Sequence, residues 1–459
     1  MRKLFTSLTA ALFLGACGAV AQTYHPSPEN IQARKQFQDM KFGIFIHWGI
    51  YSMLADGEWV QHSKRIDRNE YSHLAAGFCP SRFNAREWVE AFKDAGAGYV
   101  TITSRHHDGF SMFGTDASSY NIVDATPFGR DILKELAGEC ERQGLKLHIY
   151  YSHMDWFRPD YPAGSTSKDL PHREAKPDWN SYFNFMNTQL TEILTGYGKI
   201  GAIWFDGMWD HADNFDWQLD EQYALIHRLQ PACLIGNNHH SAPHEGEDFQ
   251  LFEQDLPGEN SAGFSGGQKV SDALPLESCQ TMNSTWGYSI TDKSYKSADE
   301  LIRRLVKSAG MNSNLLLNIG PRPDGCLPDE AMERLKEIGK WTKRYGETIF
   351  GTRGGLIKPC QWGVSTQKGD TLYLHILHLE ERTLTIPLDT KDIKSARMYD
   401  DGSKLKIRKA GNGSALISLP ATPQGVDTIV EIVLRKQKAR MTHILSGNEY
   451  SCNQGSKKT

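Results

Sequence analysis

The sequence has few cysteines, no marked excess of charge of one sign and no apolar run long enough to span a bilayer. Its 8 cysteines among 459 residues show neither a CxxC pair nor zinc-ligand spacing, which argues against a zinc site or a disulfide framework. The formal net charge of -4 offers no strong field to nucleic acid or acidic lipids, so we expect no nucleic-acid partner. With 39% hydrophobic residues, the chain can bury a large core.

The N-terminal segment is typical of a secretory signal peptide covering residues 1–21. Two basic residues precede an apolar run over residues 4–14, and small residues follow it. Cleavage after Ala21 would leave Gln22 at the mature N-terminus. The alternative is the lipobox-like stretch LGAC, which would make Cys17 a lipidated N-terminus. We therefore expect an exported protein, periplasmic or extracellular, with no membrane span.

The cysteines that would remain in the mature chain are scattered along it. In a chain this large, we expect them to act as small buried hydrophobic residues. One or two disulfide pairs are the alternative, because an exported protein meets oxidising conditions. The sequence gives no indication of the oligomeric state.

Six continuous apolar runs alternate with helical patterns over residues 22–350. The runs cover residues 42–48, 98–104, 146–152, 201–207, 233–238 and 314–320. Continuous apolarity predicts parallel strands that are covered on both faces. Capping boxes at Asn84 and Ser297 mark helix starts between them. This repetition predicts an α/β fold with a (β/α)8-like TIM barrel; the alternative, a doubly wound sheet, lacks a GxGxxG after its first strand.

The pattern changes to alternating apolar and polar residues over 351–436. The expected strands lie at residues 371–379, 381–388, 415–420 and 428–434, separated by Gly, Asp and Asn turns. This pattern predicts a small antiparallel β-sandwich after the barrel. Residues 437–459 form a polar tail without periodicity.

Several chemically capable side chains follow the expected strands, where a barrel of this kind places its catalytic groups. They include His47, His106, His107 and Asp206, accompanied by several Trp and Tyr residues. Taken singly, a histidine can be a satisfied core residue and Asp206 can cap a helix. The pair His106 and His107 with Asp108 could bind a metal, but adjacent strand residues face opposite sides. Together, neutral imidazoles, a carboxylate and aromatic rings suit a sugar, whereas a phosphate site would need Lys, Arg or a Gly-rich nest.

Cleavage of a glycosidic bond needs a second carboxyl group beside Asp206. In the retaining mechanism, one carboxylate attacks the anomeric carbon and the other carboxyl group protonates the leaving oxygen, at a separation of about 5 to 5.5 Å. Glu58, Glu253 and Glu277 lie in segments expected to be loops. Any one of them could also be an ordinary surface residue, and the pattern alone does not choose among them.

A set of motifs resembles glycoside hydrolase family 29, the retaining α-L-fucosidases, over about residues 25–435. The motifs occur in the order KFGIFIHWGIYS, GEWV, SRHHDGF, YYSHMDW, WFDG, DFQLFEQ, WGY and NLLLNIGPRPDG. The resemblance implies that Asp206 is the nucleophile. It also implies that Glu253 is the acid/base, with Glu277 in reserve. The substrate-binding residues that it implies are His47, Glu58, Trp59, His106, His107, Tyr151 and Trp286.

The resemblance implies an exo-acting α-L-fucosidase that takes fucosylated oligosaccharides or glycoconjugates and needs no metal and no organic cofactor. Two other functions stay open: a catalytically inactive fucose-binding protein, and a metal-dependent hydrolase built on His106, His107 and Asp108. The preferred fucosidic linkage depends on loops outside the fucose pocket, and the sequence does not identify it.

Overall fold

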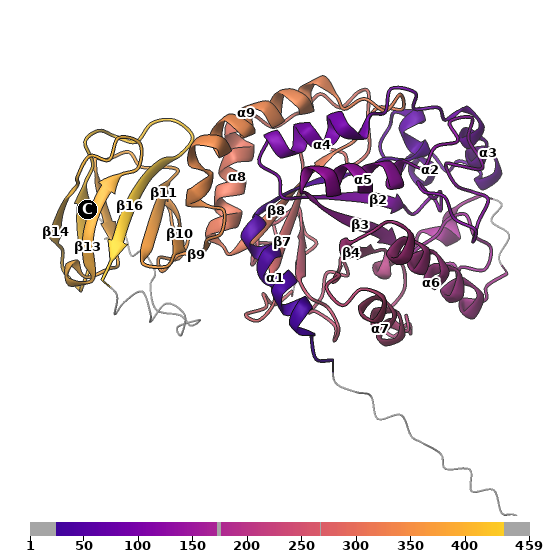
Figure 1. Cartoon of the computed structure of the whole chain (residues 1–459), viewed down its shortest axis with the longest axis horizontal. Coiled ribbons are helices and arrows are strands. Elements are labelled where there is room, and N and C mark those ends of the chain that lie inside the picture. The colour runs from indigo at the N-terminus through magenta and orange to yellow at the C-terminus, as the bar shows by residue number, and fades with distance from the viewer. Residues whose placement is uncertain (1–23, 172–175, 267, 436–459) are drawn as a thin grey trace, which may run out of the picture.

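The computed structural model describes residues 24–171, 176–266 and 268–435. Its first part is an eight-stranded parallel sheet that curls into a barrel (Figure 1). The strands are β1 (Phe42–Ile46), β2 (Tyr99–Arg105), β3 (Lys146–Ser152), β4 (Ile200–Asp206), β5 (Leu234–Asn237), β6 (Gln250–Glu253), β7 (Leu276–Thr281) and β8 (Ser313–Ile319).

The strand order, β5-β4-β3-β2-β1-β8-β7-β6, brings the first strand between the second and the last. At the two ends of this order, the carbonyl oxygen of Ile235 in β5 accepts backbone hydrogen bonds from Asp248 (2.7 Å) and Phe249 (3.3 Å), just before β6. The sheet therefore closes on itself almost completely. The predicted TIM barrel is confirmed and the doubly wound alternative is wrong.

Helices surround the strands and start where the sequence provides caps. The α-helices are α1 (Pro28–Met40), α2 (Val60–Ser63), α3 (Arg68–Ser72), α4 (Ala85–Asp94), α5 (Ile132–Gln143), α6 (Trp179–Gly196), α7 (Leu219–Leu229), α8 (Ala298–Gly310) and α9 (Asp329–Tyr345). Short 3-10 helices lie at Ile50–Leu54, His73–Gly77, Ser167–Asp169, Met208–Asp210, Gly346–Thr348 and Thr390–Asp392. The Asn84 side chain accepts from the backbone of Arg86 and Glu87, and that of Ser297 from Glu300, as the capping patterns predict.

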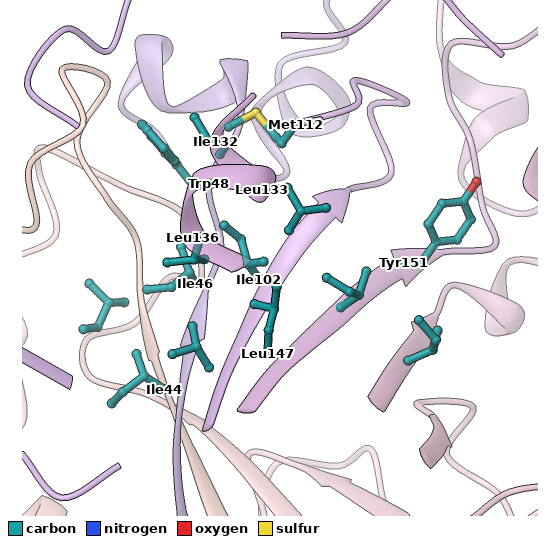
Figure 2. Close-up of a cluster of buried hydrophobic side chains, with 14 of the residues drawn as sticks. Ile44, Ile46, Trp48, Ile102, Met112, Ile132, Leu133, Leu136, Leu147 and Tyr151 are labelled. Atoms are coloured by element: carbon teal, nitrogen blue, oxygen red, sulfur yellow. The ribbon is translucent and has the colours of Figure 1, made fainter. Parts of the chain in front are cut away.

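Side chains alternate between two buried layers along each strand. One layer fills the barrel and includes Phe45, Tyr150 and Trp204. The other lies between strands and helices, and Figure 2 shows part of it, with Ile44, Ile46, Ile102 and Leu147 pointing away from the barrel interior. Both faces of the sheet are buried, which explains why the strands read as continuous apolar runs.

The C-terminal part forms two antiparallel sheets, to the left of the barrel in Figure 1. One has the order β13-β16-β11-β10-β9 and the other β12-β15-β14. Their strands are β9 (Arg353–Gly354), β10 (Gly363–Lys368), β11 (Thr371–Ile376), β12 (Thr383–Ile386), β13 (Ile393–Met398), β14 (Lys406–Lys409), β15 (Ala415–Ser418) and β16 (Thr428–Leu434). Leu372 and Leu374 of the first sheet and Leu384 and Ile417 of the second share one hydrophobic core, so the sheets form the predicted sandwich.

Several expectations fall outside the described residues: the signal peptide 1–21, the two alternatives at Ala21 and Cys17, and the tail 437–459. The boundary expected near residue 350 falls between α9 and β9. Within the described ranges, no helix is long and apolar enough to cross a membrane. Of the cysteines that the structure describes, Cys79, Cys140, Cys233, Cys279 and Cys326 are free thiols.

Candidate active site

A cavity of about 470 Å³ opens at the carboxyl ends of the barrel strands. Aromatic rings, imidazoles and carboxyl groups line it, a mixture that suits a sugar. The lining residues are Phe45, His47, Glu58, Trp59, His106, His107, Tyr150, Trp204, Asp206, Trp209, Asn238, His240, Glu253, Phe264 and Trp286. Eight of the ten site residues predicted from the sequence are among them; Tyr151 and Glu277 are not.

Asp206 is the last residue of β4, and its carboxylate accepts hydrogen bonds from four groups. Tyr150 Oη donates to Oδ2 at 2.8 Å. Gly207 N (2.8 Å), Trp209 Nε1 (3.1 Å) and Asn238 Nδ2 (3.4 Å) contact Oδ1. Asp206 caps no α-helix, since α7 begins only at Leu219. The carboxylate is therefore fixed in the cavity wall by donors on three different strand ends.

Burial raises the pKa of Asp206, because the cavity wall removes water from the charged form. The hydrogen bonds from Tyr150, Trp209, Gly207 and Asn238 act in the opposite direction and favour the carboxylate. The next residue, Gly207, has φ 91°, and a Cβ atom there would lie 2.9 Å from the Met154 Cβ. A glycine is thus required for the chain to turn directly after the carboxylate.

Glu253 is the last residue of β6 and faces Asp206 across the Asn238 side chain. Asn238 Nδ2 donates to Glu253 Oε2 at 2.8 Å. Burial, together with the negative charge of Asp206, raises the pKa of Glu253 to about 7. Near neutral pH, a substantial fraction of Glu253 therefore carries a proton.

The shared amide fixes how far apart the two carboxyl groups are. One Nδ2 atom lies 3.4 Å from Asp206 Oδ1 and 2.8 Å from Glu253 Oε2, so the two oxygens are separated by at most the sum of these distances. Retaining glycosidases place their carboxyl groups about 5 to 5.5 Å apart, and inverting ones about 6.5 to 9.5 Å apart. The geometry fits the shorter class.

The expected sugar-binding aromatic residue, Tyr151, points away from the cavity, so this expectation is corrected. Its hydroxyl donates to Gln189 in α6 at 2.8 Å, and the Arg105 guanidinium lies 4.6 Å from its ring centre. Figure 2 shows it in the layer between strands and helices. Because side chains alternate along β3, the preceding Tyr150 faces the interior and contacts Asp206 instead.

Glu277, the reserve acid/base, lies below the cavity and not in its wall, which corrects that alternative as well. It is the second residue of β7 and is fully buried. Its carboxyl group accepts from Tyr99 Oη and, at 3.0 Å, from Trp204 Nε1. Burial raises the pKa of Glu277 to about 7, but no substrate atom can reach it through Trp204.

Two of the histidines present an unprotonated nitrogen to the cavity. Asn318 Nδ2 donates to Trp286 O, so its Oδ1 accepts from His47 Nδ1 at 2.7 Å. Ser152 donates to Met154 O, so its hydroxyl oxygen accepts from His107 Nδ1 at 2.7 Å. In each ring, Nε2 is left as an acceptor for a hydroxyl group.

Burial keeps these imidazoles neutral. It lowers the pKa of His47 to about 3 and the pKa values of His106 and His107 well below their usual range. His106 and His107 follow the end of β2, and both line the cavity with ring centres 4.1 Å apart. The expectation that they face opposite sides is wrong, because strand alternation stops at Arg105. Asp108 turns away and accepts from Tyr71 Oη at 2.8 Å.

The loop after β1 supplies a further carboxyl group and an indole. Glu58 Oε2 accepts from Gly287 N at 2.6 Å, and burial raises its pKa. Trp59 stacks on Trp209, with ring centres 5.7 Å apart and planes inclined by 22°. Trp286 lies 5.1 Å from the His47 ring. Flat apolar faces and hydrogen-bonding edges thus alternate around the cavity.

Seven lining residues were missed by the sequence reasoning: Phe45, Tyr150, Trp204, Trp209, Asn238, His240 and Phe264. Side chains alternate between the two faces of a strand, so assigning one residue of β3 or β4 to a face would have identified Tyr150 and Trp204 as cavity residues. Asn238 could have been identified because it directly follows β5, at a strand end. Phe264 lies in a long segment after β6 without periodicity, and no sequence signal pointed to it.

Comparisons with known proteins agree with this geometry. The α-L-fucosidase family model matches residues 13–347. Human plasma α-L-fucosidase is 28% identical over 393 residues, covering 77% of this chain and 78% of that protein. The structure of α-L-fucosidase isoenzyme 1 from Paenibacillus thiaminolyticus is 33% identical, with a TM-score of 0.79, covering 89% of this chain and 100% of that one. A Bacteroides thetaiotaomicron GH29 α-L-fucosidase, trapped as a covalent intermediate, is 25% identical with a TM-score of 0.77, covering 90% and 98%. The chain therefore belongs to the α-L-fucosidases of glycoside hydrolase family 29.

Proposed function

We propose that the protein is an exo-acting α-L-fucosidase that hydrolyses terminal α-L-fucose from glycans with retention of configuration. The observation that carries the proposal is the carboxyl pair of Asp206 and Glu253, held by one amide in a cavity lined by aromatic rings and neutral imidazoles. The covalent intermediate trapped in the Bacteroides thetaiotaomicron relative supports the retaining mechanism.

Asp206 acts as the nucleophile. Its four hydrogen-bond donors favour the ionised form that attack on the anomeric carbon requires. In the first step, an Asp206 oxygen forms a bond to the anomeric carbon while the bond from that carbon to the leaving oxygen breaks. The product of this step is a β-fucosyl ester of the enzyme.

Glu253 acts as the general acid and then as the general base. With a pKa of about 7 it can donate its proton to the leaving oxygen in the first step. In the second step its carboxylate removes a proton from water, which attacks the anomeric carbon and releases α-L-fucose and the free Asp206 carboxylate. This chemistry uses protein groups throughout.

Several of the other cavity residues bind the fucose. His47 and His107 accept hydrogen bonds from fucose hydroxyl groups through Nε2, with His106 and Glu58 beside them. Trp59, Trp209 and Trp286 cover the apolar C–H surfaces and the methyl group. Tyr150 holds Asp206 and takes the place first expected for Tyr151.

The substrates are fucosylated oligosaccharides or glycoconjugates outside the cytoplasm. Export is supported by the basic and apolar leader and by the small residues that end at Ala21. A periplasmic or secreted enzyme cleaved before Gln22 fits this pattern, and lipidation of Cys17 is the alternative.

Removal of each carboxyl group tests the mechanism. Asp206→Gly should abolish release of the aryl group from an aryl α-L-fucoside, because the nucleophile is lost. Glu253→Ala should still form the fucosyl-enzyme from substrates with acidic leaving groups. Azide should then restore turnover and give α-fucosyl azide, since a small anion can attack without a general base.

Glu277→Ala is the control for this experiment, because burial raises the pKa of Glu277 as it does that of Glu253, but Glu277 lies outside the cavity. It should give no azide product. If azide restored the activity of Glu277→Ala and did not restore that of Glu253→Ala, Glu277 would be the acid/base and Glu253 would not. A wild-type protein that binds fucose but releases no aryl group would favour a fucose-binding protein instead.

A further inference from the structure

One large apolar side chain stands exposed at the mouth of the cavity. The described residues expose five large hydrophobic side chains, at Ile31, Leu54, Phe264, Ile290 and Met332, and of these only Phe264 lines the cavity. Phe264 is 45% exposed. An exposed ring at a binding site is a surface for a ligand to cover.

The segment that carries Phe264 is folded back on itself. Directly after β6, the buried Asp255 carboxylate accepts from Ser261 N (2.9 Å), Ser261 Oγ (2.5 Å) and Ala262 N (3.1 Å). Asn260 Oδ1 accepts from Ser265 N at 2.9 Å. These contacts on both sides of Phe264 place its ring in a defined position although the ring itself is exposed.

His240 connects this ring to the acid/base. Its ring stacks on Phe264, with centres 5.5 Å apart and planes inclined by 28°. Its Nε2 lies 3.5 Å from Glu253 Oε2. His240 has φ 59°, a left-handed conformation that is unfavourable for a residue with a Cβ. Burial lowers the pKa of His240 to about 4, so the ring is neutral.

A chain of contacts leads from the carboxyl pair to the exposed ring. Glu253 Oε2 lies next to His240 Nε2, and the His240 ring stacks on Phe264, which is exposed to solvent. Asp206 faces the anomeric carbon, and Glu253 faces the oxygen that leaves. His240 and Phe264, which follow Glu253 in this chain of contacts, therefore face the part of the substrate attached to that oxygen.

We propose that Phe264 and His240 form the binding site for the first sugar beyond fucose. The Phe264 ring covers the C–H face of a pyranose, and His240 hydrogen-bonds one of its hydroxyl groups. The two residues then determine which fucosylated glycans the enzyme prefers, while the fucose pocket stays the same. This inference rests on the proposed function, because it uses Glu253 as the acid.

Two substrates separate this role from a role in the fucose pocket. α-L-Fucosyl fluoride has a leaving group of one atom, which cannot cover the Phe264 ring. A panel of fucosylated oligosaccharides has sugar leaving groups. Phe264→Ala should lower kcat/KM about fivefold or more for at least one oligosaccharide and leave kcat/KM for the fluoride within about twofold. Phe264→Trp should retain the oligosaccharide activity, because it keeps an aromatic face.

Met332→Ala is the matched control, since Met332 is an exposed apolar residue in α9 outside the cavity lining. This substitution should leave kcat/KM unchanged for both kinds of substrate. The inference would be overturned if Phe264→Ala lost as much kcat/KM on the fluoride as on the oligosaccharides, or lost none on any oligosaccharide. In either case, turnover of these substrates by the wild-type enzyme would still support the proposed function. A wild-type enzyme that hydrolyses neither substrate would overturn both.

Discussion

Replacing Tyr150 by Phe removes one hydrogen bond from the nucleophile and leaves the others in place. Tyr150 Oη donates to Asp206 Oδ2 at 2.8 Å, while Gly207 and Trp209 still hold Oδ1 in the variant. Among the hydrogen bonds that lower the pKa of Asp206, that of Tyr150 is the largest. A hydrogen bond to a charged group contributes about 1.5 to 3 kcal/mol. The loss should therefore raise the pKa of Asp206 and destabilise its carboxylate about tenfold or more, since about 1.4 kcal/mol corresponds to a factor of ten.

The readout is the acid limb of the pH profile of kcat/KM. Asp206 must be ionised to attack, so activity falls as the pH drops through its pKa. In Tyr150→Phe this limb should move to higher pH, and kcat/KM on the acid side should fall by about tenfold or more. The profile is measured with an aryl α-L-fucoside, and the melting temperature of each variant confirms that it folds.

Tyr151→Phe is the matched control, because the same hydroxyl group is removed from the next residue on the strand. Its partner Gln189 loses one donor in a buried layer, which should lower the melting temperature by a few degrees. The acid limb should stay where it is in the wild type. An acid limb that moves in Tyr151→Phe and not in Tyr150→Phe would show that the two side chains had been assigned to the wrong faces of β3.

Further measurements test the carboxyl groups, the fucose pocket and export. The kcat/KM for fucosides with poor leaving groups should fall as the pH rises through about 7, where Glu253 loses its proton; a flat profile up to pH 9 would contradict its role as the acid. Glu277→Gln should keep kcat/KM within about twofold. Because burial raises the pKa of Glu277 from 4.5 to about 7, its contribution to stability is complete below pH 4.5 and is lost as the pH rises through 7, so the melting temperature of the variant should fall less over this range. His107→Ala should lower kcat/KM about tenfold or more, and wild-type kinetics would mean that this ring does not bind the sugar. Mass analysis of the exported protein should give an N-terminus at Gln22, whereas a diacylated Cys17 in the membrane fraction would overturn that cleavage site.

The sequence predicted the barrel because most of its strands are buried on both faces. Runs such as 98–104 and 146–152 are rich in apolar residues, are buried almost throughout and are followed by capped helices. β6 and β7 were not predicted, although they carry Glu253 and Glu277. β6 has only 4 residues, and within the described part of the chain no α-helix lies between β5 and β7. Without the alternation of strand and helix, these segments resemble loops.

Burial on both faces also limited the prediction of the site. In an amphipathic strand, polarity shows which side chains face the core, but β3 contains adjacent tyrosines and both faces are covered. Tyr150 and Tyr151 were therefore indistinguishable from the sequence. The position along a strand mattered equally, because Glu253 ends β6 at the cavity, whereas Glu277 stands near the start of β7. The two glutamates therefore differ in their distance from the end of a strand. Short apolar runs do not define that end well in the sequence.

The arrangement around Glu253 explains how one residue can serve as an acid and then as a base. Burial raises its pKa most, the negative charge of Asp206 is the second cause, and the charge of Glu58 adds a smaller increase. When Asp206 becomes bound to fucose, it is a neutral ester, and the second cause disappears. The pKa of Glu253 must then fall, because its carboxylate no longer faces the charge of Asp206. Asn238, which donates to Glu253 at 2.8 Å, continues to favour that carboxylate. The attack that consumes the proton of Glu253 thus also removes the charge that held the proton there, and it leaves a base beside the fucosyl-enzyme when water arrives.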